Sequence, residues 1–334
     1  MQTKSLFSFI FKTRIIAALV LCAILLGSVT FANGLETSNG ANGSSGKHIC
    51  TAPDCCPEEN RMLKLVSPPM NGDDVREYQI ALRKLGLYNG ALNGVFDRLT
   101  EGAVKEFQHR YGLKCDGTIG RETMRAMAQL FEAAPTRTKV KQAPSGNVML
   151  VINIDKKTLT VYDGNKVFKK YPVAVGKSKT PTPIGEFRIS RKAKNWGTGF
   201  GTRWMGLNVP WGIYGIHGTN KPWSVGSRAS HGCIRMLNSH VEELYEWVKP
   251  GTTVCIEGRV YHPLYEERKP VLRGDKGTVV VLVQQGLIAE GYLKGNPDGI
   301  FGRATEDALK RLQKDRGVEV TGQVNVDIWP ILGL

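Results

Sequence analysis

The chain lacks an apolar run long enough to cross a membrane. Its longest such run, residues 15–26, follows three basic residues and breaks at Gly27, short of the ~18 to 20 apolar residues that a membrane span needs. Basic residues, a short apolar run and small residues near Ala32 together are typical of a secretory signal peptide. We therefore expect residues 1–32 to be a signal peptide, with an uncleaved membrane anchor as the alternative.

The chain also lacks a basic helix and an arginine-rich run, although basic residues predominate. Its 45 Lys and Arg residues against 30 Asp and Glu give a formal net charge of +15 at pH 7, which indicates an anionic partner. With export expected and no basic helix or Arg-rich run, an anionic extracellular polymer fits better than nucleic acid. Plain solubility is the alternative explanation of the charge.

The cysteines show no standard metal-ligand spacing, and we expect neither a metal nor a cofactor. Cys50, Cys55 and Cys56 are spaced C-x4-C-C, and no partner motif follows them. Because export permits disulfides, we expect a local disulfide in this cluster, with Cys115 as a candidate partner. The pairing stays open, and Cys255, within an apolar run, is expected to be a buried strand residue.

Composition divides the rest of the chain into three folded segments. Residues 33–61 are rich in Gly, Asn and Ser and contain the cysteine cluster, and residues 133–147 carry prolines and lysines. Both are typical of linkers. The expected domains are residues 62–132, 148–258 and 269–334, which suits the two or three domains that a chain of this length favours.

The first and last of these domains repeat one another at fixed spacing. We expect each copy to form about three helices. The β-branched run at residues 278–283 and Gly286 are poor helix formers, so the first helix of the second copy is expected to be irregular. The matching positions are Gly94, Phe96, Thr100, Phe107, Gln108, Gly117 and Met124, which recur as Gly299, Phe301, Thr305, Leu312, Gln313, Gly322 and Trp329.

Both copies resemble the peptidoglycan-binding three-helix module of bacterial cell-wall enzymes. The resemblance rests on N/D-G-x-F, a Thr, F/L-Q and a late Gly, and it covers nearly all of residues 64–131 and 271–332. It implies that both modules bind peptidoglycan.

The segment between the two copies has the pattern of a β domain. Residues 148–154, 158–162 and 167–175 are short β-rich runs separated by turn residues. Residues 239–242 have a capping-box pattern that predicts the start of one helix. The expected fold is a multidomain α and β protein, with a mainly-β catalytic domain between two small three-helix domains.

One cysteine and two histidines of this middle segment lie close together in sequence, in HGTN at residues 217–220 and SHGCIR at residues 230–235. A cysteine attacks as a thiolate and needs a base within reach, usually histidine. His217 ends a strand-like run, and Gly232 permits a tight turn whose two successive amides face a developing oxyanion. The alternative is a core thiol beside ordinary polar histidines.

These two motifs, preceded by TPTPIGEF at residues 180–187, resemble the cysteine-dependent L,D-transpeptidase family of bacterial walls over residues 148–257. The resemblance implies that Cys233 attacks the carbonyl between the third residue of a tetrapeptide stem and its terminal D-alanine. A thioester forms and D-alanine leaves. The amine of a second stem then resolves the thioester into a 3→3 cross-link, whereas water gives carboxypeptidase activity.

The resemblance also assigns roles around the thiol. It makes His217 the base, held by the backbone carbonyl of Gly218. A carbonyl partner fixes the tautomer that leaves the other ring nitrogen free to accept a proton, so no Asp is required. Ser230, His231 and Gly232 then shape the oxyanion region.

Arg235 and Asn220 are the expected substrate-binding residues. Arg235 is suited to bind a stem carboxylate bidentately, and a structural salt bridge is the alternative. Residues 180–183 are expected to form a rigid turn, and residues 197–201 are a candidate mobile flap. Four tryptophans either line the substrate groove or pack in the core: Trp196, Trp204, Trp211 and Trp223.

Three hypotheses follow for the whole chain. It is a cross-linking transferase, a hydrolase that uses the same thioester, or a wall-binding protein with a vestigial catalytic domain. The expected partners are peptidoglycan stems and glycan, with anionic wall polymers as further candidates and no nucleic acid. The expected location is extracytoplasmic, secreted and associated with the wall, with membrane contact only through an uncleaved signal segment.

Overall fold

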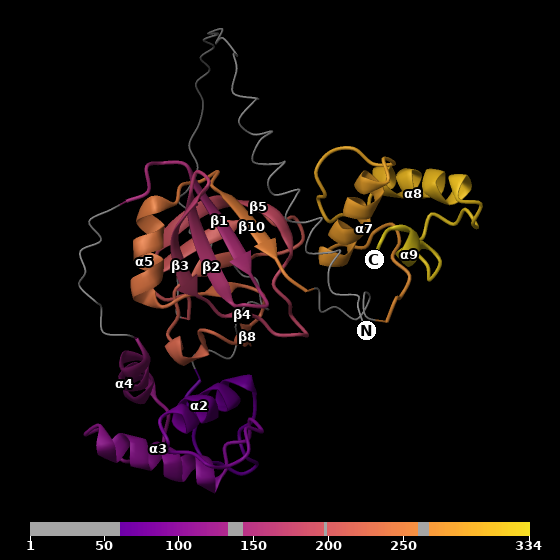
Figure 1. Ribbon diagram of the computed structural model, residues 1–334. Coiled ribbons are helices and arrows are strands. Elements are labelled where there is room, and N and C mark those ends of the chain that lie inside the picture. Colours follow the sequence, from indigo (N-terminus) through magenta and orange to yellow (C-terminus); the bar gives the residue numbers. More distant parts are fainter. Residues whose placement is uncertain (1–60, 133–142, 197–198, 260–266) are drawn as a thin grey trace, which may run out of the picture. The chain divides into compact units, whose positions relative to one another are not determined.

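The computed structural model describes residues 61–132, 143–196, 199–259 and 267–334 (Figure 1). The expected signal peptide and the cluster of Cys50, Cys55 and Cys56 lie outside the described residues. Within those four ranges, no helix is both long enough and apolar enough to span a membrane.

The first helical module contains α2 (Asp73–Lys84), α3 (Arg98–Arg110) and α4 (Arg121–Phe131). Acidic residues begin α2 and basic residues end it, which suits the helix dipole. The apolar faces of the helices enclose a core in which Val75, Leu82, Phe96 and Phe107 are fully buried.

The second module contains α7 (Thr278–Ala289), α8 (Arg303–Asp315) and α9 (Ile328–Ile331). The prediction that its first helix is irregular is wrong, because α7 is a continuous helix of 12 residues. Packing overrides propensity here, since the valines of the β-branched run are buried. Gly286 is also explained, because a Cβ atom there would lie 2.9 Å from the Cβ of Leu332.

A further pair of corresponding glutamines, Gln79 and Gln284, is structural in the two modules. The Gln79 side chain accepts a hydrogen bond from the Gly94 amide at 3.0 Å and donates to the Val95 carbonyl at 3.0 Å. Gln284 makes the same two bonds with the Gly299 amide and the Ile300 carbonyl, at 2.8 and 3.2 Å. A buried amide that satisfies loop backbone in this way fixes the turn before the second helix. The repeat therefore preserves how each module folds.

The middle domain is mainly β, as predicted. Among the described residues, eight strands form one mixed sheet in the order β3-β2-β1-β10-β5-β6-β7-β9, and β4 and β8 form a separate parallel pair. The α-helix α5 (Asn238–Trp247) lies in the same domain. The strands are β1 (Val148–Asn153), β2 (Thr158–Asp163), β3 (Lys166–Pro172), β4 (Val175–Gly176), β5 (Gly185–Lys194), β6 (Arg203–Leu207), β7 (Gly215–His217), β8 (Arg228–Ser230), β9 (Ile234–Arg235) and β10 (Thr253–Glu257).

The start of α5 differs from the predicted capping box. The helix begins at Asn238, and its N-cap, Leu237, provides no side-chain hydrogen bond. The Ser239 amide instead donates to Oε1 of Glu132 at 3.1 Å. Glu132 follows α4, so a carboxylate from the first module accepts a hydrogen bond from the first turn of α5 in the middle domain. The helix dipole favours negative charge at that end.

Two cysteines outside the expected site are described. Cys115 is exposed, and its expected disulfide partners lie outside the described residues. Cys255 lies in β10 as predicted, but it is half-buried rather than fully buried. Burial, with a smaller contribution from neighbouring carboxylates, raises the pKa of the Cys255 thiol to about 11, so this thiol is protonated at neutral pH.

Candidate active site

His217 is the last residue of β7 and is only 3% exposed. Antiparallel pairing with β6 places it opposite Trp204, and parallel pairing with β9 places it opposite Arg235. Cys233 directly precedes β9. Neighbouring strands lie about 4.8 Å apart, so this pairing brings the segment that carries the thiol alongside the strand that carries His217.

Aromatic rings surround the His217 side chain. Trp204 stacks on it with ring centroids 5.5 Å apart, and Phe200 meets it edge-on at 5.0 Å. Burial among these rings, followed by the positive charge of Arg235, lowers the pKa of His217 to about 3. The imidazole is therefore neutral at physiological pH.

A backbone carbonyl orients the imidazole. Nδ1 of His217 lies 2.5 Å from the carbonyl oxygen of Gly218. Because a carbonyl only accepts hydrogen bonds, Nδ1 carries the proton and Nε2 is left as an acceptor. Position 218 requires glycine, since a Cβ atom there would lie 2.2 Å from Oδ1 of Asn238.

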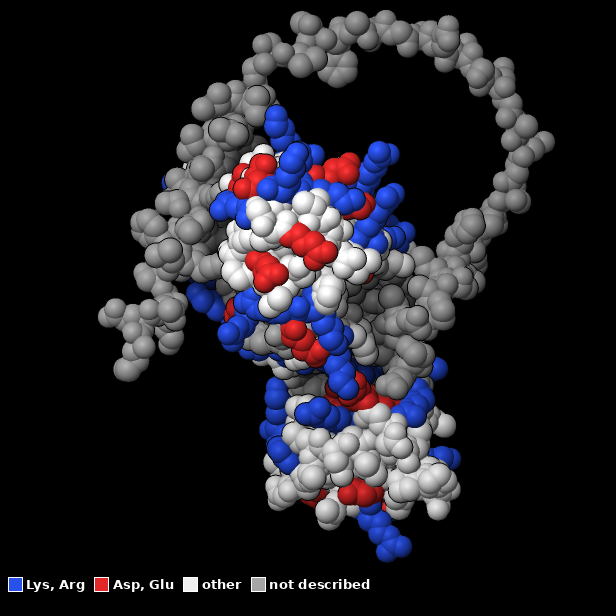
Figure 2. Space-filling model, turned by 90° about the vertical axis from the view of Figure 1, so that its right-hand side faces the viewer, with Lys and Arg blue, Asp and Glu red and all other residues white. Residues whose placement is uncertain are grey.

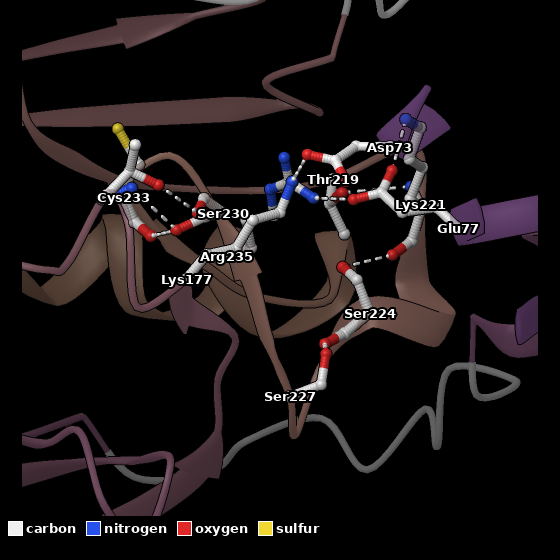
Figure 3. Close-up of polar contacts among 12 residues, drawn as sticks. Asp73, Glu77, Lys177, Thr219, Lys221, Ser224, Ser227, Ser230, Cys233 and Arg235 are labelled. Carbon is white, nitrogen blue, oxygen red and sulfur yellow. Dashed lines mark hydrogen bonds and ion pairs between the residues drawn. The ribbon is translucent and has the colours of Figure 1, made fainter. Parts of the chain in front are cut away.

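Ser230 closes the turn that carries Cys233. Its hydroxyl donates to the Cys233 carbonyl at 2.5 Å, a bond drawn in Figure 3. The same hydroxyl accepts from the Gly232 amide at 3.1 Å. The Ser230 carbonyl in turn accepts from the Lys177 amide at 3.0 Å and from the Thr180 hydroxyl at 3.3 Å. These four bonds fix the turn before β9.

The geometry of this turn revises the expectation for Gly232. Its amide donates to Ser230, so it is already occupied rather than presented to a developing oxyanion. Its φ of 115° is one that glycine adopts readily, and a Cβ atom would lie 2.6 Å from Cε1 of Tyr214. Gly232 therefore acts by allowing the turn.

The segment at residues 180–183 packs beneath the same turn. The Thr180 hydroxyl reaches the Ser230 carbonyl, and the Thr182 hydroxyl accepts from the Gly176 amide at 2.8 Å. A Cβ atom on Gly176 would lie 2.2 Å from the Thr180 carbonyl oxygen. The TPTP segment thus supports the turn that carries Cys233.

The other predicted site residues fall into different environments. His231 is exposed, whereas His217 is buried. Asn220 is half-buried, and no part of the chain that the structure describes provides a hydrogen-bond partner for its side-chain oxygen. Residues 197–198 of the candidate flap lie outside the described residues. Trp204 and Trp223 are buried, whereas Trp196 and Trp211 are half-buried.

Arg235 does not lie at the surface, where a stem carboxylate would meet it. It is 3% exposed, and its Nη1 lies 3.3 Å from Oε1 of Glu77 in α2 (Figure 3). The structural salt bridge, left open as the alternative, is the arrangement in this structure. Sequence reasoning missed Glu77 and its second partner, Lys221, because no motif connects α2 with the catalytic segments.

No cluster of three or more His, Cys, Asp or Glu side chains suited to hold a metal ion is found in the described ranges. The site has the parts needed for acyl transfer to a thiol: a cysteine on a fixed turn, a neutral imidazole with an oriented ring, and an adjacent buried cation. A neutral imidazole is suited to accept a thiol proton, as general-base catalysis requires.

We expect acid to destabilise the folded chain through His217. The pKa of His217 is about 3 when folded and 6.5 without burial, so the unfolded chain binds more protons between these values. The free energy of unfolding then falls as the pH drops from about 6.5 toward 3. Thermal unfolding should show a steeper loss of Tm over this range for the wild type than for His217→Gln.

His231 and His240, whose pKa values are also lowered, chiefly by partial desolvation of the rings, are present in both proteins and contribute equally to the two slopes. Equal slopes for wild type and His217→Gln would contradict a neutral, buried His217.

Residues 147–256 match the YkuD family of L,D-transpeptidase catalytic domains, and residues 71–127 and 276–332 each match the peptidoglycan-binding domain family. YqjB of Bacillus subtilis strain 168, named as an L,D-transpeptidase, is 35% identical over 145 residues, which cover 38% of this chain and 82% of YqjB. The chain belongs to the L,D-transpeptidase family. The predicted family and the two flanking modules are thereby confirmed.

Another member of the family is closer in sequence over a shorter stretch. YkuD of the same strain, also named as an L,D-transpeptidase, is 49% identical over 107 residues, and this chain matches 64% of its length. The solved catalytic domain of the E. faecium L,D-transpeptidase is 26% identical, covers 34% of this chain and 98% of that one, and gives a TM-score of 0.29.

Proposed function

We propose that this L,D-transpeptidase family member forms 3→3 cross-links in peptidoglycan through a thioester on Cys233, with release of D-alanine. The observation that carries the proposal is the β7–β9 pairing, which places the Cys233 turn beside a neutral, carbonyl-oriented His217. An oriented base next to a thiol is the arrangement that nucleophilic catalysis needs.

In the first half-reaction, Sγ of Cys233 attacks the carbonyl carbon between the third stem residue and D-alanine. Nε2 of His217 accepts the thiol proton and then passes it to the departing amine of D-alanine. The broken bond is the amide, and the new bond is the thioester. Ser230 holds the turn around the attacking thiol.

In the second half-reaction, the side-chain amine of another stem attacks the thioester. It loses a proton to His217, and the thiolate of Cys233 leaves and takes up that proton. The new amide is the cross-link, and the enzyme returns to its starting state. Water in place of the amine gives a tripeptide and makes the enzyme a carboxypeptidase.

Product analysis tests this proposal against its alternatives. The purified chain is incubated with a disaccharide-tetrapeptide, and the products are separated by mass. A cross-linked dimer together with free D-alanine is expected. Tripeptide monomer as the sole product would favour the hydrolase, and unchanged substrate would contradict both enzymatic functions and favour the vestigial wall-binding protein.

The charge pattern on one face of the molecule supports a wall polymer rather than nucleic acid as the partner. On the face shown in Figure 2, Lys and Arg side chains are interspersed with Asp and Glu. Helix α8 illustrates the mixture, with the i,i+4 pairs Lys310–Glu306 and Arg303–Asp307. Nucleic-acid binders typically gather basic side chains in a patch or stripe. Such a partner implies extracytoplasmic, wall-associated action.

We expect deletion of residues 269–334 to weaken binding to the wall. The second peptidoglycan-binding module raises the local concentration of substrate through avidity, which requires no new chemistry. In a pelleting assay with purified sacculi, the truncated chain should bind at least about tenfold more weakly. Turnover of a soluble stem peptide should change much less, and equal pelleting with and without the module would refute the role.

A further inference from the structure

Glu77 in α2 joins the first peptidoglycan-binding module to the catalytic domain. Its Oε2 lies 2.5 Å from Nζ of Lys221, and its Oε1 lies 3.3 Å from Nη1 of Arg235 (Figure 3). Glu77 is 8% exposed and both cations are 3% exposed. One carboxylate thus pairs with two buried cations. Removing any one of the three charges leaves buried charge without a full counter-charge.

Trp223 provides a second connection. It lies in the 3₁₀ helix η1 (Pro222–Ser224) of the catalytic domain, yet it is buried within the core of the first module. Its ring centroid is 5.3 Å from that of Tyr78 and 5.6 Å from that of Phe131. Nζ of Lys84 donates to the Trp223 carbonyl at 2.7 Å. The segment that follows His217 therefore completes the core of the module.

A third connection lies at α5. Oε2 of Glu132 accepts from Nδ2 of Asn238 at 3.2 Å. The Asn238 side chain also accepts from the Thr202 amide at 3.1 Å and donates to the Thr219 carbonyl at 2.9 Å. Asn238 thereby connects the segment before β6 to the segment that follows His217. Glu132 of the first module in turn holds the Asn238 side chain.

The second module offers an internal comparison, because its positions correspond to those of the first at an offset of 205 residues, as Gly94 and Gly299 show. The folding residue Gln79 is preserved as Gln284. The docking residues are not preserved: Glu77 corresponds to Leu282, and Lys84 to Ala289. Folding of the module therefore does not require a carboxylate at position 77.

From these contacts we infer that the first module is a structural part of the catalytic centre and that Glu77 is a positioning residue for it. Glu77 holds Arg235, which lies opposite His217 across the β7–β9 pair, and Lys221, which lies in the segment after His217. The inference rests on the proposed function only where turnover is the readout.

Charged and titratable groups lie on the segments that carry or contact the Cys233 turn, and His231 among them has a pKa lowered chiefly by partial desolvation. Arg235 lies on β9, and His231 lies in the turn itself. Nζ of Lys177 pairs with Asp73 of α2 at 2.6 Å, and the Lys177 amide bonds to that turn. Positive charge near a thiol stabilises its thiolate. Removing the charge of Glu77 therefore leaves an excess of positive charge beside Cys233.

The test is Glu77→Gln in the full chain, which keeps the shape and removes the charge. The kcat for stem cross-linking should fall about tenfold or more, with KM within about twofold, because displaced catalytic groups slow the reaction more than they weaken binding. The pH midpoint of Cys233 alkylation, followed by mass spectrometry, should move lower by about half a unit or more. Glu122→Gln, an exposed position in the same module, should change neither quantity.

The double variant Glu77→Gln with Lys221→Met returns the local net charge to its original value and should move the alkylation midpoint back. Circular dichroism establishes whether each variant is folded. If Glu77→Gln does not fold, the alkylation midpoint of the double variant is compared with that of Lys221→Met alone. Wild-type kcat and midpoint in a folded Glu77→Gln protein, or a raised kcat, would overturn the inference. If even the wild type fails to turn over stems, the proposed function fails, while the alkylation comparison still decides the role of Glu77.

Discussion

Replacing Cys233 with alanine is expected to abolish turnover of stem peptides, a loss on the order of 10⁴-fold or more. Without Sγ no thioester forms, and the remaining groups have nothing to activate except water. The variant should still pellet with purified sacculi as the wild type does, because both binding modules are intact. The measurement pairs product analysis by mass with the pelleting assay.

Cys255→Ala is the matched control, since this second half-buried thiol of the same domain lies in β10 and its pKa is raised to about 11. It should keep turnover within about threefold of the wild type. The nucleophile assignment would be wrong if Cys233→Ala remained active or if Cys255→Ala lost activity to the same extent.

His217→Gln is expected to lower kcat by about 10² to 10⁴-fold. The wild-type imidazole stays uncharged well below pH 7, because the pKa of His217 is about 3. Its protonation state therefore introduces no change in kcat/KM between about pH 5 and 8. In the variant the thiol must ionise by itself, so the residual rate should rise about tenfold per pH unit until the thiol titrates.

His231→Gln separates the two histidines. His231 is exposed and belongs to the turn, so its loss should cost at most about tenfold and should leave the shape of the pH profile unchanged. A pH profile that changed for His231→Gln, but not for His217→Gln, would reverse the two roles.

The sequence motifs predicted the groups that we propose react, because local chemistry constrains those positions. Gly232 and Gly218 each occupy a place where a Cβ atom would come within 2.6 Å of another atom, and Ser230 bonds within its own turn. The Ser230 bonds lie inside one short segment and are therefore visible as a short motif, whereas the two glycines are constrained by Tyr214 and Asn238, which lie outside the motifs. Gln108 and Gln313 of the repeat are similarly local, because each accepts from the amide of the late repeat glycine, Gly117 or Gly322.

Local patterns failed where a distant segment supplied the partner. The capping box was placed at residues 239–242, but the first turn of α5 is satisfied by Glu132. The β-branched start of α7 suggested an irregular helix, but burial of its valines makes a regular one. In both cases tertiary contacts outweighed a weak local preference.

Arg235 illustrates what a motif leaves open. Its position in SHGCIR suited either substrate binding or a salt bridge, and the choice depended on which carboxylate reaches it. That carboxylate belongs to Glu77, 158 positions earlier in the chain. The first module was expected to bind peptidoglycan, and Trp223 and Glu77 also connect it directly to the segment that follows His217.

The sequence by itself determined the family and the two flanking modules and predicted the thiol and imidazole that we propose react, because each depends on residues close together in the chain. Only the tertiary structure decided that His217 is neutral, that the Gly232 amide is occupied and that Arg235 is bound to Glu77. Burial, strand pairing and ion pairing between distant segments set these properties, and all three depend on which surfaces meet when the chain folds.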